Sequence, residues 1–253
     1  MATHKILSVI ILTYNQDEVT VVHAREAMLS NRTPDEVIVV DDGGVIGLKD
    51  KLQAMYDKSD KRCPLIYARI EQDILWNYTG AFNLGTWISR GDYLAYEDND
   101  NIPTREVYDE MIKGLEAYPE VGRVCANKRM RIYKETALTK PFEEWKEEKE
   151  GIGPNMGTNI IRREVILKLK GQDERFSGGY GWMYVTFRRQ MLNQVKTKFG
   201  MAGYYWYIMD DQTDLPHNSR RSNLSLSREI CNMNALHSPY GILNFTYTVD
   251  YLK

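Results

Sequence analysis

Cysteine is scarce in this chain, and its few copies lie far apart. The 253 residues include three cysteines, Cys63, Cys125 and Cys231, with no C-x-x-C pair among them. Zinc fingers and disulfide-stapled secreted domains need closely spaced or paired cysteines, so both classes are excluded. An odd, scattered set indicates reduced thiols, and we therefore expect a cytoplasmic protein.

Long apolar runs and an excess of charge of one sign are also lacking. The early apolar stretch Ile6–Leu12 is too short to cross a bilayer, and no small-residue cleavage site follows it. We interpret it as a buried strand and expect no transmembrane segment. The formal net charge of -2 gives the whole molecule no reason to bind a polyanion, and no internal repeat or low-complexity tract stands out.

What the chain does contain is an alternation of strand and helix patterns through its first half. Continuous apolar strands separated by helices predict an α/β fold with a mostly parallel central sheet, covered by helices on both faces. The predicted strands are Ile6–Thr13, Glu36–Val40, Leu65–Arg69 and Asp92–Tyr96, and the predicted helices are Asp17–Leu29, Leu48–Lys58, Thr79–Ser89 and Arg105–Ala117.

The second half is less regular. We predict a strand at Thr158–Ile161 and a helix at Arg163–Lys170. The charge-dense stretch 142–150 fits a solvated helix or a mobile loop, and alternatively a lid over a substrate. From Gly203 onward the chain is rich in tyrosine and polar residues, and we expect a C-terminal extension that folds back over the site. At this length the whole chain fits a single domain.

Polar residues follow three of the predicted strands at the point where each ends. They are Thr13-Tyr14-Asn15, Asp41-Asp42-Gly43-Gly44 and Asp98-Asn99-Asp100. Ligands of parallel sheets bind beyond these carboxyl ends, so three such clusters predict a site. Residues i and i+2 of a strand share a face, so Asp98 and Asp100 can point at one spot. Paired carboxylates suit Mg²⁺ or Mn²⁺ bridged to a diphosphate, although the same residues also form turns and helix caps.

Four motifs in order resemble the family 2 glycosyltransferases, whose fold is called GT-A. VIILTYN at residues 9–15 and EVIVVDDGG at 36–44 are similar to the opening of that family. NYTGAFNLGTWISRGDY at 77–93 is similar to the segment that leads into the family's D-x-D, here at 98–100. The match covers roughly residues 6 to 103. It implies a single GT-A (Rossmann-like) domain over 1–253, with a nucleotide-sugar-binding half at 1–120 and an acceptor-side half and tail at 121–253.

The resemblance also implies roles for individual residues. The backbone of Thr13 and Tyr14, together with Asp41, would contact the nucleobase of the donor, and Asp42 would assist. Asp98 would touch the ribose or the metal. Asp100 would ligate Mn²⁺ or Mg²⁺, and His217 lies where many GT-A enzymes place a further metal ligand. A divalent ion neutralises the charge that develops on the leaving nucleoside diphosphate. The other residues expected to bind the donor are Asn15, Asn77, Gly80, Asn83 and Arg220, with the neighbouring Arg221 also able to pair with the diphosphate.

The general base of the inverting members is missing from its usual place. That carboxylate belongs to a Glu-Asp pair after a G-W-G-like turn, where this chain has Met183 and Tyr184. Three explanations stay open. In the first, the base comes from elsewhere: Asp210, Asp211 and Asp214 are the nearest carboxylates in sequence to His217, and Asp211 or Asp210 is the candidate, since Asp214 could instead orient His217. In the second, the enzyme is retaining and the leaving phosphate accepts the proton. In the third, the protein binds a nucleotide sugar without turning it over.

The predicted function is a metal-dependent transfer of a sugar from a nucleotide-diphosphate sugar, with UDP-sugar expected, to a hydroxyl acceptor. The acceptor is expected to be a saccharide or a lipid-linked saccharide. DNA with a hydroxymethylated base is an alternative, because the basic run Lys128–Lys134 contains Tyr133 and suits phosphate contacts. A solvated face is the competing interpretation of that run. The oligomeric state is not indicated by the sequence.

Overall fold

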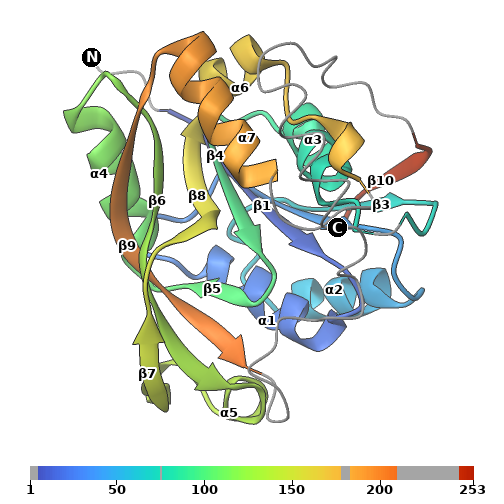
Figure 1. The fold of residues 1–253 in the computed structure, drawn as a ribbon. Coiled ribbons are helices and arrows are strands. Elements are labelled where there is room, and N and C mark those ends of the chain that lie inside the picture. Colours follow the sequence, from blue (N-terminus) through green and yellow to red (C-terminus); the bar gives the residue numbers. More distant parts are fainter. Residues whose placement is uncertain (1–4, 75, 178–182, 210–244) are drawn as a thin grey trace.

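The computed structural model describes residues 5–74, 76–177, 183–209 and 245–253, and Figure 1 shows their arrangement. The first half alternates strands and helices as predicted, and each predicted boundary lies within two residues of the observed one. Its elements are β1 (Leu7–Thr13), α1 (Asp17–Met28), β2 (Glu36–Asp41), α2 (Leu48–Asp57), β3 (Leu65–Ile70), α3 (Tyr78–Ile88), β4 (Tyr93–Asp98), β5 (Asn101–Pro103) and α4 (Val107–Ala117).

The second half contributes longer strands and shorter helices. Its elements are β6 (Val121–Tyr133), α5 (Lys134–Thr139), η1 (Phe142–Glu144), β7 (Lys149–Ile152), β8 (Asn155–Arg162), α6 (Arg163–Leu169), η2 (Glu174–Phe176), α7 (Met183–Gln190), η3 (Met191–Val195), β9 (Lys198–Met209) and β10 (Tyr247–Tyr251).

The charge-dense stretch 142–150 differs from the predicted solvated helix or mobile loop. It forms the short 3-10 helix η1 and the start of β7, which pairs antiparallel with β6. Its tryptophan, Trp145, is buried and packs edge-on against Trp206, with ring centroids 5.8 Å apart. Burial of this single indole fixes the segment to the sheet, although its other side chains are mostly charged.

One sheet runs through the whole molecule in the order β10-β3-β2-β1-β4-β8-β6-β9-β5, with β7 added beside β6. The strands β3, β2, β1 and β4 are all parallel, as are β6 and β9, whereas β8, β10, β5 and β7 pair antiparallel with their neighbours. The predicted α/β class with a mostly parallel central sheet is therefore confirmed.

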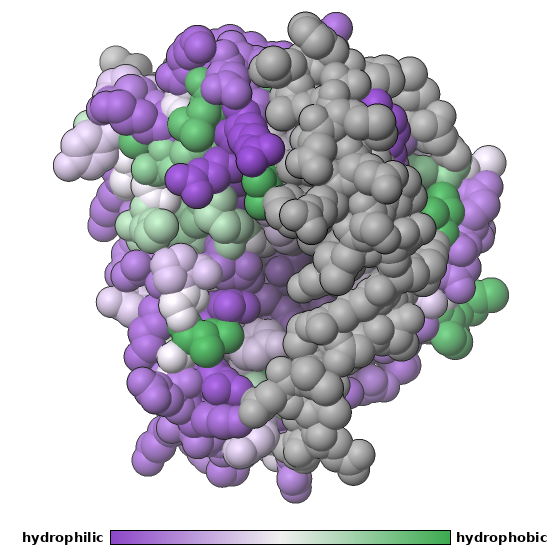
Figure 2. Space-filling view, viewed as in Figure 1, coloured by the Kyte–Doolittle hydropathy of each residue, from purple (hydrophilic) through white to green (hydrophobic). Residues whose placement is uncertain are grey.

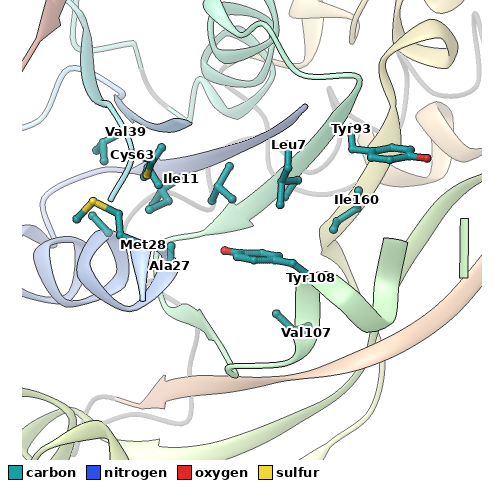
Figure 3. Packing of buried hydrophobic residues seen from close by; sticks show 14 of the residues in the cluster. Leu7, Ile11, Ala27, Met28, Val39, Cys63, Tyr93, Val107, Tyr108 and Ile160 are labelled. Atoms are coloured by element: carbon teal, nitrogen blue, oxygen red, sulfur yellow. The ribbon is translucent and has the colours of Figure 1, made fainter. Parts of the chain in front are cut away.

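Helices cover both faces of the central strands, which explains why those strands are apolar throughout. Every residue of β1 is buried, and its side chains alternate between two cores. Val9 and Ile11 belong to the core shared with α1, α2 and α4, part of which Figure 3 shows. Ile10 and Leu12 belong to the core on the opposite face, with residues of α3, α6 and α7. Because such a strand needs apolar side chains on both faces, its sequence does not alternate between apolar and polar residues.

The register of these strands brings their ends together. Thr13 at the end of β1 is paired with Asp41 of β2, and Leu12 is paired with Asp98 of β4. The polar residues that follow each strand therefore emerge at one edge of the sheet, which is the edge where ligands of parallel sheets bind.

Candidate active site

A cavity of about 820 Å³ opens at this edge. In Figure 2 hydrophilic residues line a hollow near the middle of the face shown. The cavity is lined by the ends of β1 and β4 on one side and by β6, β7 and β9 on the other. Its lining residues are Leu12, Thr13, Tyr14, Asn15, Gln16, Asp42, Trp76, Tyr78, Ala81, Asp98, Asn99, Asp100, Asn101, Arg129, Arg131, Ile152, Asn155, Tyr184 and Tyr207.

The residues after β1 are held by the loop that follows β2. Asn15 has a positive φ of 52°, a conformation that asparagine tolerates better than most residues. Its side-chain oxygen accepts a hydrogen bond of 2.6 Å from the amide of Val45. A Cβ on Gly44 would lie 2.7 Å from the same oxygen, so the close approach of the two loops requires glycine there. The two clusters therefore form one rigid wall of the cavity.

The two aspartates after β2 have different environments. Asp41 is buried, forms an ion pair of 2.5 Å with Arg69, and accepts hydrogen bonds from the Tyr67 hydroxyl and the Gly44 amide. It does not line the cavity. Asp42 does line it, and its carboxylate accepts a hydrogen bond of 3.1 Å from the backbone N–H of Asn77. A direct contact of Asp41 with a base remains a prediction, and the observed role of Asp41 is to hold the loop.

Three residues predicted to bind the donor lie behind the cavity wall. Asn77 accepts a hydrogen bond from the Ser177 hydroxyl, and Gly80 lies so close to the Asn77 side chain that a Cβ would approach it to 2.3 Å. Asn83 exchanges hydrogen bonds with the backbone of Gln172, at 2.7 and 2.9 Å. These contacts tie α3 to the segment after α6, and the predicted contacts of all three residues with a nucleotide remain untested.

Asp98 and Asp100 both line the cavity, and their environment disfavours two negative charges. Burial raises the pKa of Asp98, while a hydrogen bond from Asn155 and the charge of Arg129 act against that rise. Burial, followed by the charge of Asp98, raises the pKa of Asp100 to about 7. Two ionised carboxylates placed close together in a partly desolvated site repel each other, and a divalent ion between them would relieve that repulsion.

The donor set fits Mg²⁺ or Mn²⁺ bound together with a substrate. Both metals prefer oxygen ligands, and Mg²⁺ is commonly held by one or two carboxylates plus substrate phosphates. Within the described ranges, no group of three histidine, cysteine, aspartate or glutamate side chains gathers at one point. The arrangement therefore suits a metal that binds with its phosphate ligand and does not suit a closed protein cage.

Comparison with known proteins identifies the family. The family model described as glycosyl transferase family 2 matches residues 8–171. The chain belongs to this family. Its GT-A fold is similar to that of the mannosyltransferase PcManGT from Pyrobaculum calidifontis, solved in complex with GDP-Man and Mn²⁺, with a TM-score of 0.61 and 16% identity over 87% of this chain and 59% of that one. It is also similar to S. aureus TarS, with a TM-score of 0.54 and 15% identity over 80% of this chain and 60% of that one.

These likenesses show the fold and no more. The chain spans about three-fifths of the length of each of the two solved structures. No curated protein matches it. In the described residues, none of the helices has the length and apolar character that crossing a membrane requires.

At the position that the sequence resemblance assigns to the base of inverting family 2 glycosyltransferases, this chain has no carboxylate. Met183 is buried beside Phe176. Tyr184 lines the cavity with its ring edge-on to Tyr78, at 5.4 Å between centroids. Burial and the charge of Asp98 raise the pKa of Tyr184 well above its ordinary value, so its hydroxyl keeps its proton. Asp42, Asp98 and Asp100 are the carboxylates among the described lining residues.

Several residues that were predicted to act in catalysis or binding fall outside the described residues. They are Asp210, Asp211, His217 and Arg220, all within 210–244. Their roles as base, metal ligand and diphosphate partner stay predictions. The strand that leads to Asp210 is present, since β9 ends at Met209 and its Tyr207 lines the cavity.

Sequence reasoning missed a buried histidine beneath the D-x-D. His23 of α1 is fully buried, and its Nδ1 lies 3.0 Å from the carbonyl oxygen of Asn99. A carbonyl only accepts, so Nδ1 carries a hydrogen and donates it. The other ring nitrogen, Nε2, lies 2.6 Å from a carboxylate oxygen of Glu97. His23 therefore fixes both ends of the segment 97–99, and a lone histidine in a helical pattern offered no signal for this role.

Two arginines of the cavity were also missed as a pair. Arg129 and Arg131 lie two residues apart on β6 and both line the cavity. The basic run Lys128–Lys134 is thus divided between faces, because Met130 and Ile132 pack into the core cluster around Trp206. The period-2 spacing of the two arginines was the available signal, had the run been interpreted as a strand.

Proposed function

We propose that this protein is a metal-dependent glycosyltransferase that moves a sugar from a nucleotide-diphosphate sugar to an acceptor hydroxyl. The observation that supports it most is the pair Asp98 and Asp100, which lie half-buried at the end of β4 in a cavity that Thr13 and Asp42 also line. The cavity volume of about 820 Å³ is in the range of small-molecule sites.

Each wall of the cavity has its own task in this proposal. The rigid wall of Thr13–Asn15 and Asp42 binds the nucleoside through backbone groups and one carboxylate. Asp100 ligates the metal and Asp98 assists or contacts the ribose. A bound Mg²⁺ or Mn²⁺ supplies positive charge where the leaving diphosphate gains negative charge. His23 holds the Asn99 carbonyl, so the two aspartates are kept at a fixed separation across it.

The donor is proposed to be a UDP-sugar, as the sequence predicts. The similar mannosyltransferase was solved with GDP-Man, so a guanine donor is the direct competitor. The acceptor is proposed to be a saccharide or a lipid-linked saccharide. DNA is disfavoured by the division of the basic run, since Lys128 pairs with Glu147 at 3.3 Å while its neighbour Arg129 lines the cavity.

A nucleotide-sugar-binding protein without turnover is the second candidate. It is favoured by one observation, the replacement of the usual base by buried Met183 and by Tyr184, whose hydroxyl keeps its proton. The two candidates differ in product formation. A transferase releases nucleoside diphosphate from its donor, by slow hydrolysis in the absence of an acceptor, whereas a binder leaves the donor intact.

Metal-dependent donor binding, which both candidates require, is tested by a thermal-shift panel of UDP-, GDP- and TDP-sugars with and without Mn²⁺ or Mg²⁺. A ligand that binds only the folded state raises the melting temperature. We expect a shift that needs both metal and nucleotide and that is lost in Asp100→Ala. Glu110→Gln, which removes an exposed negative charge on α4, is the matched control and should behave as wild type. No shift with any nucleotide, or an unchanged shift in Asp100→Ala, would contradict the proposal.

A further inference from the structure

The wall of the cavity opposite the nucleoside residues carries positive charge. Arg129 and Arg131 reach the cavity from β6, which in the sheet order lies three strands from β1, across β4 and β8. In that order β4, which ends at Asp98, lies between the strand of the arginines and β1. The arginines therefore face a different part of a bound substrate than Thr13 does.

Arg129 differs from the arginines that stabilise the fold. Arg69, Arg105 and Arg175 each form an ion pair with an aspartate or glutamate, at 2.5 to 3.0 Å. Within the described part of the chain, the Arg129 side chain has no hydrogen bond or ion pair, and its buried Nε has no partner. Its guanidinium lies 5.2 Å from the centre of the Tyr207 ring. A buried donor without an acceptor is costly, which is expected where a ligand supplies the acceptor.

Arg129 is close to the two aspartates without bonding to them. Its charge acts against the rise in the pKa of both Asp98 and Asp100, yet no ion pair joins it to either carboxylate. A carboxylate neutralised by arginine would be a poor metal ligand, and here that competition is avoided. The guanidinium is left available for an anion next to the proposed metal site.

Neighbouring strands add further donors to the same wall. Arg131 is paired with Tyr207 of β9, and Tyr207 is paired with Asn101 of β5, so these three residues form one row across the sheet. Burial, followed by the charge of Asp100, raises the pKa of Tyr207 to about 12, and its hydroxyl therefore keeps a proton to donate. Two guanidinium groups and a phenol converging on one cavity wall match the oxygens of a phosphate group.

We propose that Arg129 and Arg131, assisted by Tyr207, form a phosphate-binding subsite on the β6–β9 wall of the cavity. The role of this subsite in a reaction rests on the proposed function, whereas phosphate binding by the subsite does not depend on it. Two substrates can bring the phosphate: an acceptor that carries a phosphate group, or the donor through its diphosphate. We expect the acceptor, because the arginines lie on the far side of Asp98 from the nucleoside wall.

The test uses inorganic phosphate and glycerol 3-phosphate as probes, titrated calorimetrically into the full chain. One titration uses protein in chelator, and a second uses protein saturated with nucleoside diphosphate and Mg²⁺. We expect both probes to bind nucleotide-loaded protein, and Arg129→Gln to weaken that binding by about tenfold or more, the effect of one lost charge-assisted bond. Arg129→Lys, which keeps the charge but loses the fork, should give an intermediate loss.

Lys128→Gln is the matched control, since it removes the same charge from the next residue of β6, whose partner is Glu147. It should leave phosphate binding unchanged. If Arg129→Gln instead weakens nucleoside diphosphate binding, and loaded protein binds no phosphate, the subsite stands and the donor is its source. Phosphate binding that depends on Arg129 in chelator, without any nucleotide binding, would refute the proposed function and keep the subsite. Equal affinities of Arg129→Gln and Lys128→Gln for both probes and for the nucleotide would overturn the inference.

Discussion

The Nε2 atom of His23 lies 2.6 Å from Oε2 of Glu97, and both side chains are completely buried beneath the proposed metal site. Glu97 also accepts hydrogen bonds from the hydroxyls of Tyr205, at 2.8 Å, and Tyr108, at 3.2 Å. One carboxylate thus joins α1, α4 and β9 behind β4. Because Glu97 directly precedes Asp98, this buried network positions the segment that carries both predicted metal ligands.

Removing the histidine from this pair should destabilise the protein strongly. His23→Ala leaves the Glu97 carboxylate buried without its closest partner and frees the Asn99 carbonyl, so we expect a loss of about 3 kcal/mol in the free energy of unfolding. Urea denaturation followed by circular dichroism measures it. Lys49→Ala, which breaks the half-exposed pair of Lys49 with Asp250, is the control and should change little. A loss as small as the control's would mean that the pair does not hold the segment.

The stability of the metal-free protein should depend on pH through Asp100. The folded state raises the pKa of Asp100 from 3.8 to about 7, so over this interval the unfolded state binds fewer protons than the folded state. The stabilising contribution of the protonated group is therefore present below about pH 4 and is lost as the pH rises to about 7.

Asp100→Asn isolates this effect. In the presence of a metal chelator, the stability of the variant should not fall through Asp100 as the pH rises. The variant should be more stable than wild type above pH 7, because it removes one of two neighbouring negative charges. Mg²⁺ with nucleoside diphosphate should stabilise wild type increasingly over the same interval and should not stabilise the variant. Denaturant midpoints measured at several pH values provide the comparison, and a variant that is less stable than wild type at pH 8 in chelator would contradict this prediction.

Gly157 should be required for the position of Asp98. A Cβ at residue 157 would lie 2.5 Å from Oδ2 of Asp98 and 2.8 Å from the Tyr184 hydroxyl, so Gly157→Ala must displace the carboxylate, the phenol or both. We expect Mn²⁺ affinity in the presence of nucleotide to fall by about tenfold, comparable to the loss of a group that orients a metal ligand.

Gly153→Ala is the matched control for this change. It lies four residues earlier, and a Cβ there would meet no atom within 4 Å. Calorimetric titration of Mn²⁺ into both variants compares them. Equal affinities in Gly157→Ala and Gly153→Ala would show that Asp98 does not need its observed position to bind the ion.

Tyr184 should contribute to the shape of the cavity and not to proton removal. Its raised pKa keeps the hydroxyl protonated near neutral pH, so Tyr184→Phe should retain turnover within about tenfold of wild type. Release of nucleoside diphosphate from the donor measures this. A loss of more than about a hundredfold, with donor affinity unchanged, would instead assign proton transfer to the phenol.

Local patterns in the sequence were sufficient for much of the fold. The apolar runs of β1 to β4, the helical periods between them and the polar cluster after each strand are properties of short segments, and the structure reproduces their boundaries within two residues. The order of these motifs also indicated the family that the comparison identifies. The carboxylates Asp98 and Asp100 could be named in advance because the carboxyl ends of parallel strands always meet at one edge.

Contacts between distant segments could not be predicted in the same way. His23 and Glu97 are 74 residues apart, and only the packing of α1 against the sheet makes them partners. Asp41 matches a motif in the sequence, but pairing of β2 with β3 places Arg69 beside it and turns it away from the cavity. Arg129 and Arg131 looked like part of one charged run until the antiparallel β7 and the parallel β9 enclosed this part of β6.

The sequence by itself determined the type of each element and the edge at which a site forms, because hydrophobic period and strand polarity are local properties. Tertiary structure alone decided which polar side chains reach the cavity and which are consumed in holding its walls. The physical reason is that a buried charged group keeps whichever partner the register brings within hydrogen-bond distance. Asp41 forms an ion pair with Arg69, and Glu97 forms one with His23. Arg129, at the other wall, has no acidic partner within the described residues and lines the cavity.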